Sequence, residues 1–540
     1  MDTSREGFWL LNLQSWWTHF GRFGISTLAA AILVSIFVHK IIGFRRKSLP
    51  PGPWPLPIVG NFLSLHDKLG PYIALDKVAA KYGDLVYLRL GSFPCVVVSS
   101  ADVARQVAKN NDQDFLCRPE GILIEKTGPD GFKTMSSLPY GDAWRNLRKI
   151  CTVELFTKRR LAFFEQGRAE ELREMLKDIQ KEAARGLIVN LRDKLGISTL
   201  NIMTRMLLNK RVFVTGDEEH QREFHLVHNM ISTALELSGT FVIGDFVPYL
   251  TFITKMQSVY KRAERHQEMS IAICHKFTRL DERRRALELN PDKIPDDFPK
   301  DFVDVLLSSK SADGKGRLDD DTIIGMMLEM LIAGTDTSAT VIEWGMAELV
   351  RNPNILKRAQ KELDSVVGTD RLVEESDLPN LPYLQALVKE CFRLHAPGPL
   401  GVPRKSVAPL KLGEYTLPAN TRLIFNLATI HRDSRVYESP LKFDPERFLK
   451  NPDINVGPNE HFELLPFGFG RRSCPGQPLA STVVLMTIAN LCQAFSWALP
   501  EDQDPHTLDM SEDPFGLVLT RKNPLMVVAK PRKVMSSVTI

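Results

Sequence analysis

Cysteine is scarce in this 540-residue sequence, and no two cysteines form a Cys-x-x-Cys pair. Structural zinc sites usually take their cysteines from closely spaced pairs. Secreted domains built on disulfides need a dense, even set. The sequence therefore argues against a zinc site and a disulfide framework, and it suits a reducing compartment. The seven cysteines are Cys95, Cys117, Cys151, Cys274, Cys391, Cys474 and Cys492.

An excess of one charge is also lacking. The chain has 69 lysines and arginines against 65 aspartates and glutamates, which gives a net charge of +4. Proteins that bind nucleic acid need concentrated basic residues to neutralise phosphates, and no such block occurs, so we expect no nucleic-acid partner. The sequence also lacks a glycine-rich dinucleotide fingerprint and a phosphate-binding loop. If the protein performs redox chemistry, its electrons must come from another protein.

One long hydrophobic run is present, near the N-terminus. Residues 24–42 read GISTLAAAILVSIFVHKII, about the length a helix needs to cross a hydrocarbon core of about 30 Å. The basic cluster that follows at once, Arg45-Arg46-Lys47, places this end in the cytosol by the positive-inside rule. We expect a lumenal segment over residues 1–22 and a transmembrane anchor over residues 23–43. A cleaved signal peptide is the alternative, which the basic cluster disfavours.

Proline is concentrated directly after the anchor, in the run PPGPWPLP from Pro50 to Pro57. Such density stiffens a linker and predicts a basic, proline-rich hinge over residues 44–60. From there the pattern is mostly helical, with short β-like runs at residues 85–90, 95–98, 410–415 and 421–427. Without a linker-like break, we predict a mainly α fold with a small β part, as a single large domain over residues 61–530 with a tail over 531–540.

The most informative segment is the loop FGFGRRSCPG, which runs from Phe467 to Gly476. It places Cys474 just before a predicted helix over residues 477–497. A free thiol has a pKa of about 8.5, and positive charge from Arg471, Arg472 and the helix N-terminus would favour its thiolate, which binds metals. The loop glycines would let a flat, bulky group approach the backbone. A buried structural cysteine is the alternative.

This loop fits the pattern Phe-x-x-Gly-x-Arg-x-Cys-x-Gly without a mismatch and resembles the haem-binding loop of the cytochrome P-450 superfamily. The resemblance implies haem b as the cofactor, with Cys474 as the axial ligand of its iron. It also implies that Phe467, Gly470 and Arg472 lie at the haem. The hinge, the loop and the tail look most like those of plant-type microsomal members, so the domain over residues 61–530 is expected to be a P-450 catalytic domain.

A second motif lies in the middle of a long predicted helix, which opens at Asp319-Asp320-Asp321 and stops near Pro353. The run AGTDTS, residues 333–338, contains several poor helix formers. One interpretation is a hydroxyl bonded back to the preceding turn, Thr337 to the Ala333 carbonyl for example. The other is the superfamily's distal motif, which matches at every position. It implies an opening in the helix and makes Thr337 and Asp336 the catalytic residues that handle protons for dioxygen reduction.

Two charged motifs complete the resemblance. Glu390 and Arg393 stand three apart on one helix face, which alone is typical of a surface pair. Together with Arg447 in the run PERF, they resemble the superfamily's structural network, which would lie buried behind the haem loop and serve folding and haem retention. Two haem propionates also need donors. By resemblance these are Trp144, Arg148, Arg404 and Arg472, although a solvated surface position is the commoner place for an arginine.

Substrate contacts are inferred from the resemblance alone. They fall in the segment 122–138, at Ala333, at Leu400 and Val402, and at Phe515 in the run 515–517. Most of these residues are apolar, which fits a hydrophobic or aromatic small molecule.

The predicted function is a haem-thiolate monooxygenase that hydroxylates such a molecule in plant specialised metabolism, of a phenylpropanoid or flavonoid kind. The oxygen comes from dioxygen and the electrons from NADPH through a partner flavoprotein, a cytochrome P-450 reductase, with cytochrome b5 as a further partner. A basic docking face is expected at Lys149, Lys158, Arg159 and Arg160. The expected location is the endoplasmic reticulum membrane, single-pass, with the catalytic domain in the cytosol.

Three alternatives stay open at this point. The first is a fatty-acid hydroxylase. The second is a haem-thiolate isomerase or dehydratase that acts without dioxygen, against which the intact Asp336-Thr337 pair and the anchor argue. The third is a membrane-anchored adaptor or haem carrier without enzymatic activity, which the complete distal motif disfavours.

Overall fold

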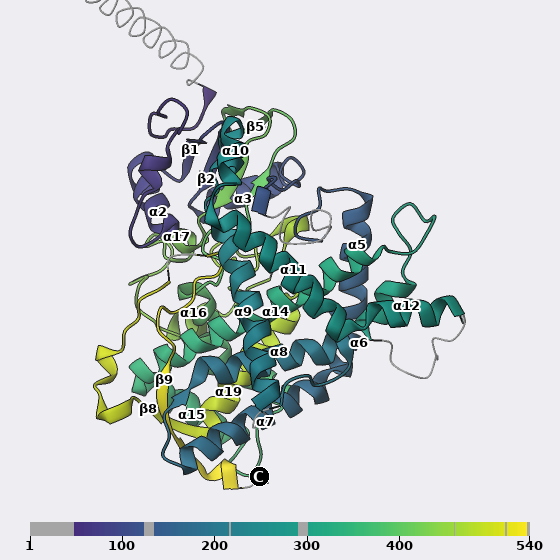
Figure 1. The fold of residues 1–540 in the computed structure, drawn as a ribbon. Coiled ribbons are helices and arrows are strands. Elements are labelled where there is room, and N and C mark those ends of the chain that lie inside the picture. The colour runs from purple at the N-terminus through teal and green to yellow at the C-terminus, as the bar shows by residue number, and fades with distance from the viewer. Residues whose placement is uncertain are drawn as a thin grey trace, which may run out of the picture. The chain divides into compact units, whose positions relative to one another are not determined.

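The computed structural model describes residues 48–123, 134–214, 218–289, 301–457, 460–513 and 516–536. The chain divides into two units, residues 1–50 with 410–417 and residues 51–409 with 418–540. In the first unit, strands β5 (Leu410–Leu412) and β6 (Tyr415–Leu417) form an antiparallel hairpin. Its turn places Gly413 at a φ of 58°, which a glycine adopts without strain. The other labelled elements belong to the second unit (Figure 1).

The predicted lumenal segment and anchor, residues 1–22 and 23–43, lie outside the described residues, as do residues 44–47 of the hinge. Within the ranges the structure describes, none of the helices has both the length and the hydrophobicity to cross a membrane.

Helices dominate the second unit, so the prediction of a mainly α fold with a small β part is confirmed. The α-helices are α2 (Pro71–Tyr82), α3 (Ala101–Asn110), α5 (Asp142–Leu155), α6 (Lys158–Phe163), α7 (Glu165–Ala184), α8 (Leu191–Leu208), α9 (Glu218–Gly239), α10 (Thr251–Thr254), α11 (Ser258–Thr278), α12 (Leu280–Leu289), α13 (Phe302–Ser308), α14 (Asp320–Arg351), α15 (Pro353–Val366), α16 (Pro382–Leu394), α17 (Leu427–His431), α18 (Glu446–Lys450) and α19 (Gln477–Ala494).

Two small sheets complete this unit. The first has the order β1-β2-β7-β4, in which β1 and β2 are antiparallel, β2 and β7 parallel, and β7 and β4 antiparallel. The second has the order β3-β9-β8. The strands are β1 (Leu85–Leu90), β2 (Phe93–Val98), β3 (Val189–Asn190), β4 (Arg404–Lys405), β7 (Arg422–Phe425), β8 (Phe495–Ala498) and β9 (Met526–Pro531).

Helix α14 forms the centre of the hydrophobic core. It is apolar on nearly all sides, as expected for a helix surrounded by protein, and it packs on α8, α9, α16 and α19. Its start follows from the Asp319 side chain, which accepts a hydrogen bond from Thr322 N–H at 2.8 Å. Its end follows from Pro353, which begins α15. The acidic start and the proline stop predicted from the sequence are both present.

The helix predicted over residues 477–497 is shorter than expected. Helix α19 ends at Ala494, and Phe495 to Ala498 form strand β8, which pairs antiparallel with β9. Phe495 and Trp497 are buried while the residues after each are exposed, so the period has changed from helix to strand. The apolar spacing alone could not reveal this change, because the partner strand lies some thirty residues further along the chain.

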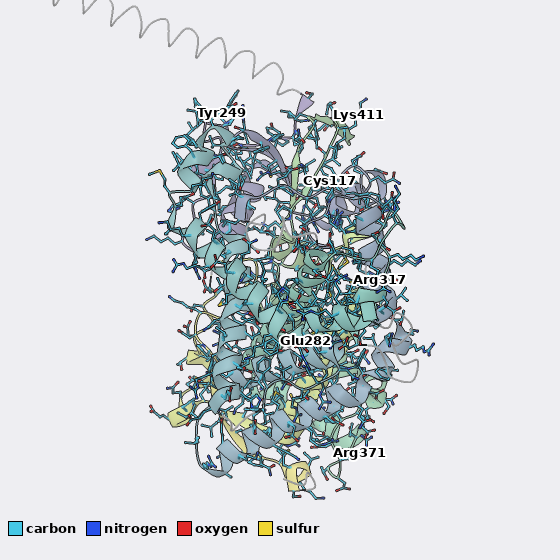
Figure 2. All side chains as sticks on the ribbon, turned by 45° about the vertical axis from the view of Figure 1, so that its right-hand side comes forward. Cys117, Tyr249, Glu282, Arg317, Arg371 and Lys411 are labelled. Carbon is cyan, nitrogen blue, oxygen red and sulfur yellow. The ribbon has the colours of Figure 1, made fainter. Side chains whose placement is uncertain are left out.

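Some large apolar side chains stay outside the core. Tyr249, Phe252 and Met256, on the segment that contains α10, are 81%, 63% and 80% exposed. Figure 2 shows Tyr249 pointing outward at the edge of the molecule. In the N-terminal segment, Ile58 and Leu63 are each 72% exposed. Phe62 packs against the stretch just before the segment that contains α10, since its ring centroid lies 4.8 Å from that of Phe241 and 4.9 Å from that of Phe246.

Candidate active site

A cavity of about 1160 Å³ lies between α14 and the loop that carries Cys474. Cys474 contributes to its wall, as do Ala333, Gly334 and Thr337 from the middle of α14. Most of the remaining lining is apolar. The size and the largely apolar wall suit the enclosure of an organic group and a small ligand.

Cys474 differs from the other cysteines of the chain because its side chain is exposed, whereas five others are buried and Cys117 is half-buried. Its exposed surface faces the cavity. The Cys474 N–H donates to the Phe467 carbonyl at 2.9 Å, which folds the loop back on itself. A cysteine kept only for packing would be buried, so this position favours the metal-binding interpretation over the structural one.

The surroundings of Cys474 both raise and lower the pKa of its thiol. The thiol is exposed only to the cavity, and the protein around that cavity keeps it from bulk water, which raises the pKa. The backbone N–H groups of Gly476 and Gln477 at the start of α19, and the positive charge of Arg148, lower it. The helix start therefore supports the thiolate as expected. The neighbouring arginines bind elsewhere: Arg471 pairs with Asp112 at 3.1 Å, and Arg472 donates to backbone carbonyls. Arg148 is thus the arginine whose charge lowers this pKa, and a contribution from Arg471 and Arg472 stays a prediction.

Gly470 has a different neighbour from the one predicted. A Cβ atom at this position would lie 2.2 Å from Asp112 Oδ1, and the residue has a φ of 68°. Gly470 does not line the cavity, so its missing side chain makes room for the Asp112 carboxylate. That carboxylate joins Arg404 and Arg471, each at 3.1 Å. Gly476 lines the cavity, and the place of Gly470 at the haem stays a prediction.

The predicted donors all reach the cavity wall, and each makes a protein hydrogen bond there. Arg148 donates to the Ser473 carbonyl at 2.8 Å, and Arg404 to the Phe469 carbonyl at 2.6 Å. Arg472 donates to the carbonyls of Leu116, Met135 and Leu138. Trp144 Nε1 donates to the Met135 carbonyl at 3.0 Å. Burial lowers the pKa of Arg472 to about 10, because a charged group is less stable where it is removed from water.

Sequence reasoning missed Arg118, which also lines the cavity. Its guanidinium donates to the carbonyls of Val402 at 2.6 Å and Pro403 at 2.9 Å, while its Nε has no hydrogen-bond partner. Burial, together with the charges of Arg404 and Arg472, lowers the pKa of Arg118 to about 9. The sequence signal was a single arginine after an apolar run and before Pro119. Buried arginines gathered at one wall favour an anionic ligand.

On α14 the back-bonding alternative is present, since Thr337 Oγ1 donates to the Ala333 carbonyl at 2.6 Å. The helix runs without a break through this region. A Cβ atom at Gly334 would lie 2.5 Å from Met203 Sδ, so this glycine allows α8 to approach α14 closely. The expected opening of the helix at Gly334 is therefore absent, although Thr337 remains on the cavity wall.

Asp336 does not line the cavity. Its Oδ2 accepts a hydrogen bond from Ser232 of α9 at 3.2 Å, and its Oδ1 lies 3.8 Å from His228 Nε2 on the same helix. Oδ1 is buried without a hydrogen bond. Burial raises the pKa of Asp336, and His228 and Ser232 counteract that rise. His228 and Ser232 were not identified from the sequence, because nothing local relates α9 to the distal motif.

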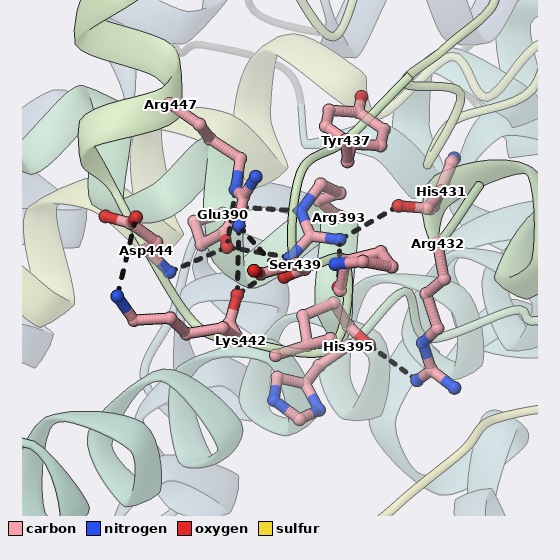
Figure 3. Close-up of polar contacts among 12 residues, drawn as sticks. Glu390, Arg393, His395, His431, Arg432, Tyr437, Ser439, Lys442, Asp444 and Arg447 are labelled. Atoms are coloured by element: carbon pink, nitrogen blue, oxygen red, sulfur yellow. Dashed lines mark hydrogen bonds and ion pairs between the residues drawn. The ribbon is translucent and has the colours of Figure 1, made fainter. Parts of the chain in front are cut away.

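Glu390, Arg393 and Arg447 form the ion-pair geometry that the motifs suggested, and Figure 3 shows it. Glu390 and Arg393 are fully buried, with Nε to Oε2 at 2.6 Å and Nη2 to Oε1 at 2.8 Å. Arg447 Nε adds a bond to Glu390 Oε1 at 3.0 Å. The surface-pair alternative is excluded for this network by its burial.

The network continues toward the cysteine loop through His431. Arg393 Nη1 donates to the His431 carbonyl at 2.9 Å, and the ring Nε2 accepts from Leu465 N–H at 2.8 Å. Leu465 directly precedes the segment from Pro466 to Gly468, which lines the cavity. Burial and the charge of Arg393 lower the pKa of His431 to about 3, so the ring is neutral and can accept this bond.

The predicted substrate contacts are partly brought together. Ala333 and Val402 line the cavity, as do residues 135–138 and Leu517. Leu400 is not in the lining and packs against the clusters around Leu75 and Tyr72, so its contact with a substrate stays a prediction. Phe515 and residues 124–133 lie outside the described residues. On the expected docking face, Lys149, Lys158 and Arg159 are exposed, while Arg160 pairs with Glu154 at 2.6 Å.

Comparisons with known proteins agree on one family. The family model for cytochrome P450 matches residues 50–528. A flavonoid 3'-monooxygenase of Crocosmia x crocosmiiflora is 38% identical over 93% of this chain and 97% of that protein. A flavonoid 3'-monooxygenase of Petunia hybrida is 37% identical over 94% and 98%. A zebrafish cytochrome P450 structure with progesterone shares the fold, with a TM-score of 0.70 at 24% identity over 86% of this chain and 100% of that chain.

Proposed function

Because the chain belongs to the cytochrome P450 family and is a monooxygenase, we propose that it hydroxylates a small aromatic molecule of the flavonoid or phenylpropanoid type. The observation that carries this proposal is the exposed Cys474 thiol in a largely apolar cavity of about 1160 Å³. The names of the similar plant proteins supply the substrate class. Hydroxylation in plant specialised metabolism is the setting that they share.

The residues at the cavity fit haem b, the cofactor that the family implies. The Cys474 thiol faces the cavity, and the guanidinium groups on its wall can bind the two propionates. The Nε of Arg118, which has no hydrogen-bond partner, is one free donor. We propose Cys474 as the axial ligand, with Phe467 and Trp144 beside the haem and Arg118, Arg148, Arg404 and Arg472 as the anion-binding group. When bound, the haem would supply oxygen activation, which thiolate ligation favours.

The protein's own part in the reaction is proton handling and substrate placement. We propose that the Thr337 hydroxyl, on the cavity wall, passes protons to the reacting side. Asp336 supplies Thr337 from behind and takes its protons from the α9 side, where His228 and Ser232 contact its carboxylate. Ala333 and Val402 help to shape the space for the substrate.

Electrons must enter from a partner, since the sequence has no nucleotide-binding motif. The proposed partner is an NADPH-dependent cytochrome P-450 reductase, with cytochrome b5 as a second donor. The exposed Lys149, Lys158 and Arg159 support docking at α5 and α6, where opposite charges raise the rate of association.

We also propose attachment to the endoplasmic reticulum membrane, through the apolar segment 23–43 and the surface of the catalytic domain. The exposed Ile58, Leu63, Tyr249, Phe252 and Met256 support this location, because an apolar surface of this kind suits a lipid interface.

The test uses the full chain in microsomes with a plant reductase. The reduced protein should give a strongly red-shifted Soret band with carbon monoxide, and Cys474→Ser should abolish this band. Cys492→Ser is the matched control, because Cys492 is buried in α19 and does not line the cavity. A panel of flavonoids, hydroxycinnamic acids and fatty acids is then screened by absorption shift and NADPH-dependent product formation.

Hydroxylated flavonoid or phenylpropanoid products support the proposal. If only fatty acids are converted, the proposed substrate class is wrong and the protein is a fatty-acid hydroxylase. Conversion of a hydroperoxide without NADPH or dioxygen uptake would make the protein an isomerase or dehydratase. A folded protein that never gives the carbon monoxide band contradicts the role of Cys474 and everything built on it.

A further inference from the structure

A short turn, Thr134–Leu138, contributes Met135, Ser136, Ser137 and Leu138 to the cavity wall. The turn is closed by its own hydrogen bonds: Leu138 N–H donates to the Thr134 carbonyl at 3.0 Å, and Thr134 N–H donates to Ser137 Oγ at 3.2 Å. The N–H groups of Met135 and Ser136 take no part in this closure. They need a partner elsewhere, because a buried N–H without one is costly.

Both N–H groups donate to one carboxylate, that of Glu329 in α14. Met135 N–H lies 2.9 Å from Oε2 and Ser136 N–H lies 2.7 Å from Oε1. Glu329 lines the cavity one helical turn before Ala333, on the same face of α14. Charge-assisted bonds to both carboxylate oxygens are stronger than neutral ones and fix direction as well as distance. The turn is therefore attached to the distal helix at two adjacent points.

The opposite edge of the same turn is held by two side chains already assigned to the haem. The Met135 carbonyl accepts from Trp144 Nε1 at 3.0 Å and from Arg472 Nη1 at 3.1 Å. The Leu138 carbonyl accepts from Arg472 Nη2 at 2.7 Å. The turn thus connects α14, through Glu329, to the loop of Cys474, through Arg472. Loss of either attachment would free one edge of the cavity wall.

We propose that Glu329 is a positioning residue that fixes the turn Thr134–Leu138 as a wall of the substrate cavity and, through this turn, sets the positions of Trp144 and Arg472. The shape offered to the substrate then depends on one carboxylate of α14. This inference rests on the proposed function only in taking the cavity as the place where the substrate binds.

The test is hydrogen–deuterium exchange, read by mass spectrometry on the full-length holoenzyme. Glu329→Gln keeps the shape of the side chain but loses the charge and one acceptor. Glu343→Gln is the matched control: Glu343 is a buried carboxylate of the same helix that accepts Leu525 N–H at 2.9 Å, pairs with Arg192 of α8 at 3.0 Å, and does not line the cavity. Glu329→Asp keeps both acceptors on a shorter stem.

The amides of Met135 and Ser136 should be protected in the wild type. In Glu329→Gln their exchange should be faster by roughly tenfold or more, the effect of losing a charged hydrogen bond. Glu329→Asp should restore part of the protection, and Glu343→Gln should change exchange near Leu525 and Arg192 but not at the turn. Flavonoids that bind the wild type should have a different dissociation constant in the Glu329→Gln protein, the same protein in which exchange at the turn is faster.

Equal exchange of the turn in wild type and Glu329→Gln would overturn the proposal, as would the same increase in Glu343→Gln. If Glu329→Gln does not fold, unprotected amides at Met135 and Ser136 in the wild type overturn it without any variant. The exchange measurement needs no substrate. A protein that fails every flavonoid assay but shows this local effect therefore contradicts the proposed substrate and leaves the role of Glu329 standing.

Discussion

Replacing Arg393 by alanine should destabilise the protein strongly, because it strands the Glu390 carboxylate in the core. Arg393 makes two bonds to Glu390 and further bonds to the carbonyls of His431, Pro440 and Lys442. After the substitution, Glu390 keeps only the Asp444 N–H and Arg447 Nε as donors. Breaking one partner of a fully buried pair costs about 3–5 kcal/mol.

The comparison with a second arginine tests this magnitude. Arg371 also binds a carboxylate with two bonds, to Asp377 at 2.6 and 2.7 Å, but its side chain is 46% exposed. Arg371→Ala should therefore cost at most about 1 kcal/mol. Removing both members of the buried pair, as in Glu390→Gln with Arg393→Met, should cost less than Arg393→Ala alone, because no carboxylate is then left buried without Arg393.

The assay is urea denaturation followed by circular dichroism, with haem retention followed in parallel by the carbon monoxide band. Arg393→Ala should unfold and lose haem at distinctly lower urea than the wild type, and Arg371→Ala at nearly the same concentration. If Arg393→Ala keeps its haem and lies within about 1 kcal/mol of the wild type, the assignment of this network to stability is refuted.

Further predictions concern His431, Gly334 and Thr337. The pKa of His431 is lowered from its usual value to about 3, so its contribution to stability is present above about pH 6.5 and is lost as the pH falls toward 3, at up to about 1.4 kcal/mol per pH unit. His431→Gln should flatten this acid dependence in a denaturation series from pH 7 to pH 4; an unchanged slope contradicts the neutral ring. Gly334→Ala should cost about 1–3 kcal/mol by overpacking against Met203, and Met203→Ala should relieve part of that cost in a double-mutant cycle. Thr337→Ala should keep haem and substrate binding but release more hydrogen peroxide per NADPH consumed, whereas Thr337→Ser should behave like the wild type; equal peroxide release by all three proteins would remove Thr337 from proton handling.

The parts of the site that could be predicted from sequence are those encoded within one turn or one loop. The Cys474 loop precedes its helix, and α14 begins at an aspartate cap and ends at a proline, because caps and breakers act on their immediate neighbours. The Glu390–Arg393 pair was readable as an i, i+3 spacing. Its burial was inferred only from the family resemblance.

The missed residues are those defined by contacts between distant segments. Glu329 meets residues nearly two hundred positions earlier in the chain, and Asp336 meets α9 across about a hundred. Arg118 reaches the carbonyls of Val402 and Pro403 from the other end of the domain's sequence. The spacing of residues in the sequence does not indicate such contacts. They form only when segments far apart in the chain pack together. The same reason explains why the close neighbours of Gly334 and Gly470, Met203 and Asp112, could not be predicted.

The fit between Gly470 and Asp112 has a practical consequence for protein engineering. In the ten-residue loop, the second glycine lies against the Asp112 carboxylate from just beyond α3, which also pairs with two arginines. A transplant of the loop into a new scaffold would carry the cysteine but leave this carboxylate behind. Designers who borrow the segment should bring an acidic partner with it.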